Sequence, residues 1–425
     1  MLKTISSSGA PASPRNKLFV MMILEFFIWG AWLPLIWGYM GTPVAEGGLG
    51  FSATQQAWIG SGFAIASILG IFFSNQFADR TFAAEKFMAF SHFVGGLAML
   101  GLYWATTFPV FFALMLIHSI LYVPTISVAN SLAFANMKDA SKEFGFVRMG
   151  GTIGWILASW PLYFILDGKT GFDATQARKA IFLVSGIASL VLAGYSLLLP
   201  HTPPKKGTEK NAWIATGRRL AIPFILVLFI VTFIDATIHN GYFLVTPGFL
   251  EKSAGFESKW IMPIMSLGQI AEILAMMVLG GVLAKFGWKK TMLVGIAGHA
   301  LRFAIYAFFP QNQPLIILVQ LLHGICYAFF FATVYIFIDA VFPKDVRASA
   351  QGWFNLLILG LGDLAGKWLF LPLAEKLTTD GVTDYRTLFL VPTGMALGAM
   401  VLLALFFRPP SYGPVGENAP AAAPH

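Results

Sequence analysis

Gln269 and Glu272 are polar side chains inside an otherwise apolar stretch of 25 residues that runs from Trp260 to Ala284. A run of that length is typical of a transmembrane helix, because about 20 residues span the hydrocarbon core. An ionised carboxylate at mid-bilayer costs roughly 2.5–3.5 kcal/mol, and it is tolerated where it faces a polar cavity, a partner or a substrate path. Positions three apart share one helix face, so both groups are predicted to face one site. There they could bind a hydroxylated or heterocyclic solute and exchange a proton.

A second polar group occurs between residues 145 and 166. Arg148, Thr152 and Trp155 are spaced i, i+4 and i+7, so they share one helical stripe. Glycines beside the stripe let another helix or a ligand approach closely. Two interpretations stay open: Arg148 binds the solute, or it extends to the cytoplasmic surface, which is about one turn away.

The apolar run 220–246 contains four polar side chains within six residues, namely Asp235, Thr237, His239 and Asn240. A glycine and a proline follow them, which indicates a helix that bends beside a cavity. The alternative is that Thr237 and Asn240 form hydrogen bonds between helices, with His239 a satisfied interior donor.

Four further positions, two of them on one helix face, combine polar chemistry with an apolar setting. His323 and Tyr327 share a helix face at i, i+4, either at the site or as packing residues. Glu25 lies inside the first apolar run and has either a structural partner or a transport role. Asp363 is interpreted as a structural acid that pairs with nearby basic residues such as Lys367.

The composition excludes a soluble globular protein. The chain has 425 residues with 57% hydrophobic and 11% charged residues and a mean hydropathy of +0.72, whereas soluble domains carry about 25% charged residues. We predict an all-α membrane protein with twelve transmembrane helices, at 17–40, 54–77, 87–106, 109–136, 145–166, 178–199, 220–246, 260–284, 289–309, 313–341, 348–374 and 385–408.

The connections define the expected domains. Residues 200–219, the longest central connection, divide the spans into six-helix bundles at 17–199 and 220–408. Residues 1–16 and 409–425 are expected to be disordered tails. The first apolar run is too long for a signal-peptide core and is interpreted as a retained span.

Lys and Arg residues set the predicted orientation, because cytoplasmic loops are enriched in them. Of the 28 such residues, 19 fall on one side of the membrane, 7 on the other, and Arg302 and Lys367 lie within spans. Both termini are therefore predicted to be cytoplasmic. The net charge of +8 reflects this bias rather than nucleic-acid binding.

The two halves repeat one another at matching loops. NQFADRTFAAEKFM after the second span corresponds to GGVLAKFGWKKTM after the eighth, and KEFGFVRMGGTIGW before the fifth corresponds to KDVRASAQGWF before the eleventh. This pattern indicates a duplicated six-helix unit, the plan of major facilitator transporters.

Several segments carry a closer likeness: IWGAWLPLIWGYM, YVPTISVAN, RMGGTIGW, LPHTP, GQIAE, LRFAIYAF, VRASAQGWF and DGVTDYRT. With them the chain resembles the nucleoside:proton symporter family of the major facilitator superfamily, from about residue 18 to 408. The nucleoside-binding positions of that family fall on Arg148, Thr152, Trp155, Thr237, Asn240, Gln269, Glu272, His323 and Tyr327. The chain departs from the family at Trp155 (typically Phe), Thr237 (Gln), His323 (Tyr), Tyr327 (Phe) and Ala328 (Asp).

The resemblance implies a proton-coupled transporter that imports nucleosides or nucleoside-like solutes by alternating access across the bacterial inner membrane. Glu272 is the leading candidate for the coupling proton, and Asp235 and Glu25 are further candidates. The expected partners are the solute, protons and the lipid bilayer, without nucleic acid, cofactor or metal. The chain is expected to act as a monomer.

Three other functions remain open from the sequence. Aromatic and carboxylate side chains also suit a proton-coupled sugar or oligosaccharide transporter. A membrane-embedded enzyme would need a catalytic cluster, and the sequence has no metal-ligand spacing, nucleophile elbow or phosphate loop. A sensor that binds a solute without moving it is the third possibility.

Overall fold

The computed structural model describes residues 14–137, 140–203, 217, 219–342 and 347–409. Most of the predicted tails and of the connection 200–219 lies outside these residues. The helices of the first half are α1 (Arg15–Gly41), α2 (Ala53–Thr81), α3 (Ala84–Gly101), α4 (Phe108–Asn136), α5 (Ala140–Leu157), α6 (Ser159–Leu166), α7 (Gly171–Arg178) and α8 (Ala180–Ser196). The first helix thus begins two residues before the predicted span.

The second half is also helical. Its helices are α10 (Pro223–Lys252), α11 (Ile261–Phe308), α12 (Gln313–Val319), α13 (Leu321–Cys326), α14 (Thr333–Val341), α15 (Arg347–Asn355), α16 (Gly362–Lys376) and α17 (Tyr385–Phe406). Two π-helical segments, η3 (Tyr327–Ala332) and η4 (Leu356–Leu361), interrupt the α-helical runs. Short 3-10 helices lie at η1 (Val44–Glu46) and η2 (Ser258–Trp260).

Within the described residues, nine helical segments are long and apolar enough to cross a membrane. One of them, Ser258–Phe308, holds the two predicted runs 260–284 and 289–309, and non-helical backbone angles at Gly287 (φ 71°, ψ 175°) break α11 between them. A positive φ of this kind favours glycine, which has no Cβ to clash. The predicted runs 54–77 and 87–106 correspond to α2 and α3, which are not among the nine.

A small β-hairpin is a departure from the all-helical prediction. Strands β1 (Thr378–Thr379) and β2 (Val382–Thr383) pair antiparallel between α16 and α17. Asp380 and Gly381 form the turn with positive φ values of 51° and 78°. Asp-Gly is the dipeptide that two-residue hairpin turns favour for this reason, so the sequence did contain the signal.

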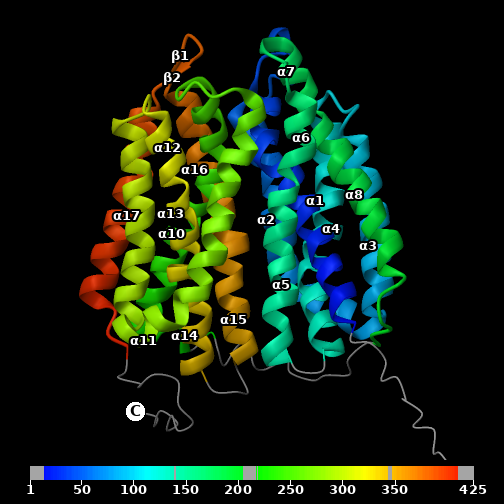
Figure 1. Ribbon diagram of the computed structural model, residues 1–425, viewed down its shortest axis with the longest axis vertical. Helices are drawn as coiled ribbons and strands as arrows, with labels where there is room; N and C mark the ends of the chain where they lie inside the picture. The colour runs from blue at the N-terminus through cyan, green and yellow to red at the C-terminus, as the bar shows by residue number, and fades with distance from the viewer. Residues whose placement is uncertain (1–13, 138–139, 204–216, 218, 343–346, 410–425) are drawn as a thin grey trace, which may run out of the picture.

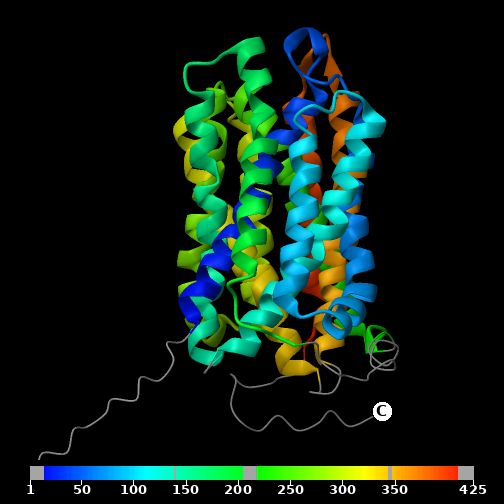
Figure 2. The ribbon, with the colours of Figure 1, turned by 90° about the vertical axis from the view of Figure 1, so that its right-hand side faces the viewer.

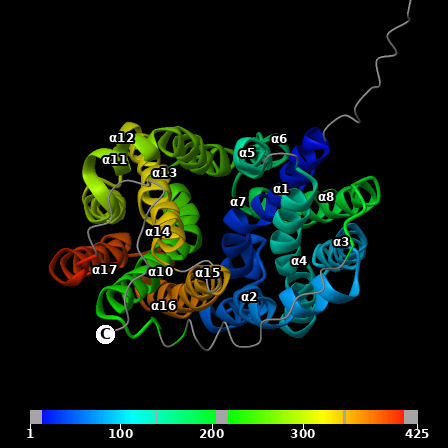
Figure 3. The same ribbon diagram turned by 90° about the horizontal axis from the view of Figure 1, so that it is seen from below.

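The helices form two groups that lie side by side. Figure 1 shows α1 to α8 in one group and α10 to α17 in the other, and the side view shows that most helices run along the long axis (Figure 2). The start of α1 and the end of α17 lie at the same end of the molecule. Seen from below, the groups meet along two seams (Figure 3), where α5 packs on α11 and α2 packs on α16 and η4.

Contacts between the two halves also occur toward the other end of the molecule, away from the start of α1. Arg178 of α7 forms an ion pair with Glu251 of α10. Lys259 binds Asp167 at 2.9 Å, and the backbone N–H of Ala53 donates to Glu375 Oε1 at 3.0 Å. A cavity of about 390 Å³ lies among these residues, lined by Arg178, Glu251 and Glu375.

Glycines of α5 place the polar stripe of that helix against α1. A Cβ at Gly154 would overlap the backbone of Ile23, and a Cβ at Gly150 would lie 2.7 Å from the carbonyl oxygen of Phe19. Only glycine permits this distance between the two helices. As a result, Arg148 and Trp155 lie next to aromatic side chains of α1.

Candidate functional site

Gln269 and Glu272 lie in the part of α11 that packs against α13. A Cβ at Gly324 of α13 would overlap the backbone of α11 at Glu272, so this glycine sets how closely the two helices pack. Gln269 is buried, and its Oε1 has no hydrogen-bond partner among the residues that the structure describes. A buried polar atom without a partner costs about 1–3 kcal/mol, which a donor on a bound solute would offset.

Glu272 lies close to charged and phenolic groups of two other elements. It interacts electrostatically with Arg148 of α5, and Tyr327 of η3 interacts with both. The Arg148 guanidinium lies 4.4 Å from the centre of the Phe26 ring, a cation–π contact. Arg148 and Glu272 therefore lie on helices that pack at the seam between the halves, within electrostatic range of each other and of Tyr327.

Trp155 extends this cluster toward α1 and α10. Its ring lies 5.3 Å from Trp29 and 5.7 Å from Phe243, both in edge-on geometry. Thr152 is half-buried on the same stripe of α5, between Arg148 and Trp155. The predicted stripe of α5 thus faces the second half of the molecule at Trp155.

Asn240 forms a hydrogen bond between helices as the alternative interpretation predicted, whereas Thr237 bonds within α10 and His239 Nδ1 has no partner among the described residues. Thr237 Oγ1 donates to the carbonyl oxygen of Phe233 at 2.8 Å. Asn240 Nδ2 donates to the carbonyl oxygens of Ala236 at 2.9 Å and Ile358 at 3.2 Å. The Asn240 side chain also lines a cavity between the halves.

That cavity is rich in aromatic side chains and lies next to the cluster. Its lining includes Trp29, Trp32, Trp37, Phe63, Asn240, Phe243, Asp363 and Lys367. Within the described chain, the indole N–H groups of the three tryptophans have no hydrogen-bond partner. The predicted pairing of Asp363 with Lys367 is confirmed, and the pair is buried beside this cavity.

His323 is buried among rings and a guanidinium. Its Nδ1 lies 2.9 Å from Arg302 Nη1, and its ring stacks on His239 at 4.8 Å. Tyr327, one turn further on, lies 6.0 Å from His239. Arg302 is fully buried beside His323, a position that its place as a basic residue inside an apolar run had marked as unusual.

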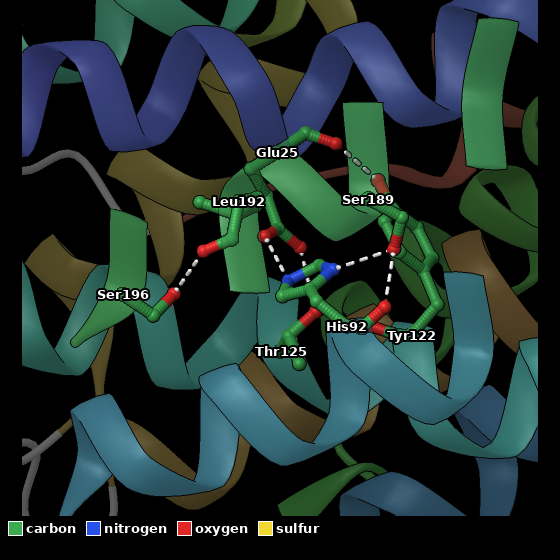
Figure 4. A network of polar contacts seen from close by, with 7 residues as sticks. All are labelled: Glu25, His92, Tyr122, Thr125, Ser189, Leu192 and Ser196. Carbon is green, nitrogen blue, oxygen red and sulfur yellow. Dashed lines mark hydrogen bonds and ion pairs between the residues drawn. The ribbon is translucent and has the colours of Figure 1, made fainter. Parts of the chain in front are cut away.

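The two further carboxylates lie apart from the cluster. Asp235 is fully buried, and His299 Nε2 lies 3.6 Å from its Oδ2 atom. Glu25 is fully buried among helices of the first half, where His92 Nε2 lies 2.9 Å and Thr125 Oγ1 2.7 Å from its oxygens (Figure 4). Glu25 therefore has the structural partner that one interpretation of the sequence predicted. Among the described residues, no cluster of His, Cys, Asp and Glu could hold a metal ion.

Comparison with known proteins identifies the family. Residues 13–412 match the family described as Nucleoside H+ symporter. The chain belongs to this family. Membership confirms the resemblance predicted from the sequence motifs, and it makes the chain a transporter rather than an enzyme.

Relatives of this symporter family align along nearly the whole chain. The putative nucleoside transporter YegT of Escherichia coli (strain K12) is 32% identical over 407 residues, which cover 92% of this chain and 93% of that protein. The nucleoside permease NupG of the same organism is 26% identical over 415 residues, which cover 92% and 96%. The crystal structure of the nucleoside transporter NupG has the same fold, with a TM-score of 0.80 and 24% identity over 93% of this chain and 99% of that chain.

Proposed function

We propose that this protein imports nucleosides together with protons across the bacterial inner membrane. The observation that carries the proposal is the convergence of Arg148, Glu272 and Tyr327 from both halves, beside the unpartnered amide oxygen of Gln269. Family membership supports it, as do the nucleoside transporters among the relatives.

The proposed topology is twelve spans in two six-helix bundles, 17–199 and 220–408, joined by 200–219 and flanked by tails 1–16 and 409–425. Two observations support it: α11 contains two apolar runs on either side of Gly287, and α1 begins at the end of the molecule where α17 ends. With the Lys and Arg bias, both termini are cytoplasmic. The protein acts as a monomer, since each half supplies part of the site.

Different site residues contact different parts of the solute. Gln269 and Glu272 hold ribose hydroxyls or base edges, because an amide and a carboxyl group offer donors and acceptors. Arg148 and Asn240 add hydrogen bonds. Trp155 and Tyr327 stack on the base. Thr152, Thr237 and His323 complete the lining.

Proton coupling follows from the position of Glu272 at the seam. When Glu272 is ionised, its attraction to Arg148 links α11 of the second half to α5 of the first. A proton on Glu272 removes that charge and weakens the link, so the halves can rock about the bound solute. The solute then leaves on the side where the proton is released.

Uptake by proteoliposomes tests this function. We expect radiolabelled uridine and adenosine to accumulate when the interior is alkaline, and only to equilibrate when no proton gradient is imposed. Excess unlabelled nucleosides should compete, whereas disaccharides should not. Competition by disaccharides alone would make the protein a sugar transporter, and binding without flux would make it a sensor.

A further inference from the structure

A network of buried polar groups lies in the second half, next to the cluster of Arg148, Glu272 and Tyr327. Arg302 is fully buried and lies between two histidines, with Nη2 at 3.0 Å from His299 Nδ1 and Nη1 at 2.9 Å from His323 Nδ1. A guanidinium can only donate hydrogen bonds, so both Nδ1 atoms must accept. Both rings are therefore neutral and carry their proton on Nε2.

Asp235 lies at one end of this network, beyond His299. The Nε2 atom of His299 is 3.6 Å from Asp235 Oδ2, which is too long for a hydrogen bond. Both oxygens of Asp235 lack a hydrogen-bond partner in the part of the chain that the structure describes, as does His299 Nε2. A buried carboxylate without hydrogen bonds is costly when ionised but much less so as a neutral acid. This geometry suits a carboxyl group that holds a proton.

The first half contains a matching set of residues at corresponding places. Glu25 of α1, His92 of α3, and His118 and Tyr122 of α4 correspond to Asp235 of α10, His299 of α11, and His323 and Tyr327 of α13 and η3. The correspondence extends to one further position. His118 Nδ1 bonds to the carbonyl oxygen of Gly95, three residues after His92, and Arg302 stands three residues after His299.

The two sets differ in how fully the carboxylate is bonded. Glu25 has His92 at 2.9 Å and the Thr125 hydroxyl at 2.7 Å, and the Tyr122 hydroxyl donates to its backbone carbonyl at 2.6 Å (Figure 4). Asp235 has neither a threonine nor a histidine within hydrogen-bond distance among the described residues. In the first set both oxygens of the carboxylate have a hydrogen-bond partner. In the second set neither oxygen has one among the described residues, so Asp235 can still gain partners.

We propose that Asp235, His299 and Arg302 form a second proton-binding site that acts on the nucleoside contact at His323, whereas Glu25 and His92 form its structural counterpart. The proposal rests on the proposed proton-coupled function. Asp235 binds and releases the proton. His299 and Arg302 are positioning residues that transmit the change to His323.

The movement follows from the charge on Asp235. Loss of its proton to water leaves a carboxylate that attracts the Nε2–H of His299 and the Arg302 guanidinium. Because one guanidinium holds both rings, a shift of Arg302 moves His323, which stacks on His239 beside Tyr327. Proton release at Asp235 thus changes how tightly the site binds the solute.

Other titratable groups lie around this network, and the two charged ones among them, Asp363 and Lys367 of α16, pair with each other at the cavity. The neighbouring titratable groups are His239 and Tyr242 of α10, Tyr306 of α11 and Cys326 of α13. The Tyr242 hydroxyl donates to Gln320 Oε1 at 2.8 Å, and Gln320 Nε2 donates to the Tyr306 hydroxyl at 2.7 Å.

The test compares Asp235→Asn with the matched variant Glu25→Gln in proteoliposomes. We expect Asp235→Asn to lose at least about tenfold in proton-driven uridine accumulation and to keep uridine counterflow, which needs no net proton movement. Its uridine affinity should also lose most of its dependence on pH. Glu25→Gln should lower thermal stability but keep accumulation and the pH dependence of affinity.

Two results would overturn the inference: wild-type accumulation by Asp235→Asn, or the same loss of pH dependence in both variants. If Asp235→Asn does not fold, Arg302→Lys provides the second variant, because a single ammonium cannot hold both rings in the same geometry. It should flatten the pH dependence of affinity as well, and an unchanged profile would contradict the proposal. A wild-type protein that fails to accumulate uridine would instead refute the proposed function.

Discussion

Replacing Glu272 by glutamine is expected to abolish proton-driven accumulation of uridine while leaving part of the binding. The glutamine amide keeps the size of the side chain and one acceptor oxygen, but it cannot exchange a proton. The electrostatic link between Glu272 and Arg148 across the seam is also lost, so the halves no longer respond to proton binding at this position. In proteoliposomes with an alkaline interior, the variant should bring uridine only to equal concentrations on the two sides.

A carboxylate away from the site provides the control. Glu257 lies outside the long helices, between α10 and α11, where it pairs with Lys259 at 3.0 Å. Glu257→Gln should accumulate uridine as well as the wild type does. Accumulation against the gradient by Glu272→Gln would remove Glu272 from the coupling mechanism.

Arg148→Ala is expected to weaken uridine binding by about 10- to 100-fold. A hydrogen bond to a charged group contributes about 1.5–3 kcal/mol, and 1.4 kcal/mol corresponds to a factor of about ten in affinity. Arg148→Lys should lose less, because the ammonium keeps the charge but not the planar fork of donors. Isothermal titration of uridine into purified variants measures the difference.

A surface role for Arg148 predicts a different result. In that case both substitutions would leave the affinity unchanged and would only reduce the amount of folded protein. Lys17 is a suitable control, because its ammonium bonds to the carbonyl oxygen of Leu198 at an exposed position. Lys17→Ala should not change the affinity for uridine.

The features that could be predicted most completely from the sequence are those that depend on the periodicity of a single helix. Apolar runs of the length that spans a bilayer predicted most helices, and spacing placed Gln269 and Glu272 on one face. The boundary between the predicted spans 260–284 and 289–309 is confirmed, because the backbone leaves helical geometry at Gly287. The β-hairpin was missed although its Asp-Gly turn is a known signal.

Contacts between helices could not be predicted from spacing alone. Periodicity shows that Arg148 lies on a polar stripe, but not that this stripe meets Glu272. The distance between those helices depends on glycines such as Gly324, whose role becomes clear only when the facing backbone is known. For the same reason, no role could be predicted for His92 and His299 before the fold placed each one beside a buried carboxylate.

Proton movement that accompanies uridine is the most direct test of the central claim. Uridine is added outside proteoliposomes that contain the wild-type protein and no imposed gradient, and the external pH is followed with a dye. Coupled import predicts that the external medium becomes more alkaline as uridine enters, and that Glu272→Gln abolishes this change. Uridine entry without any change in external pH would contradict proton-coupled import.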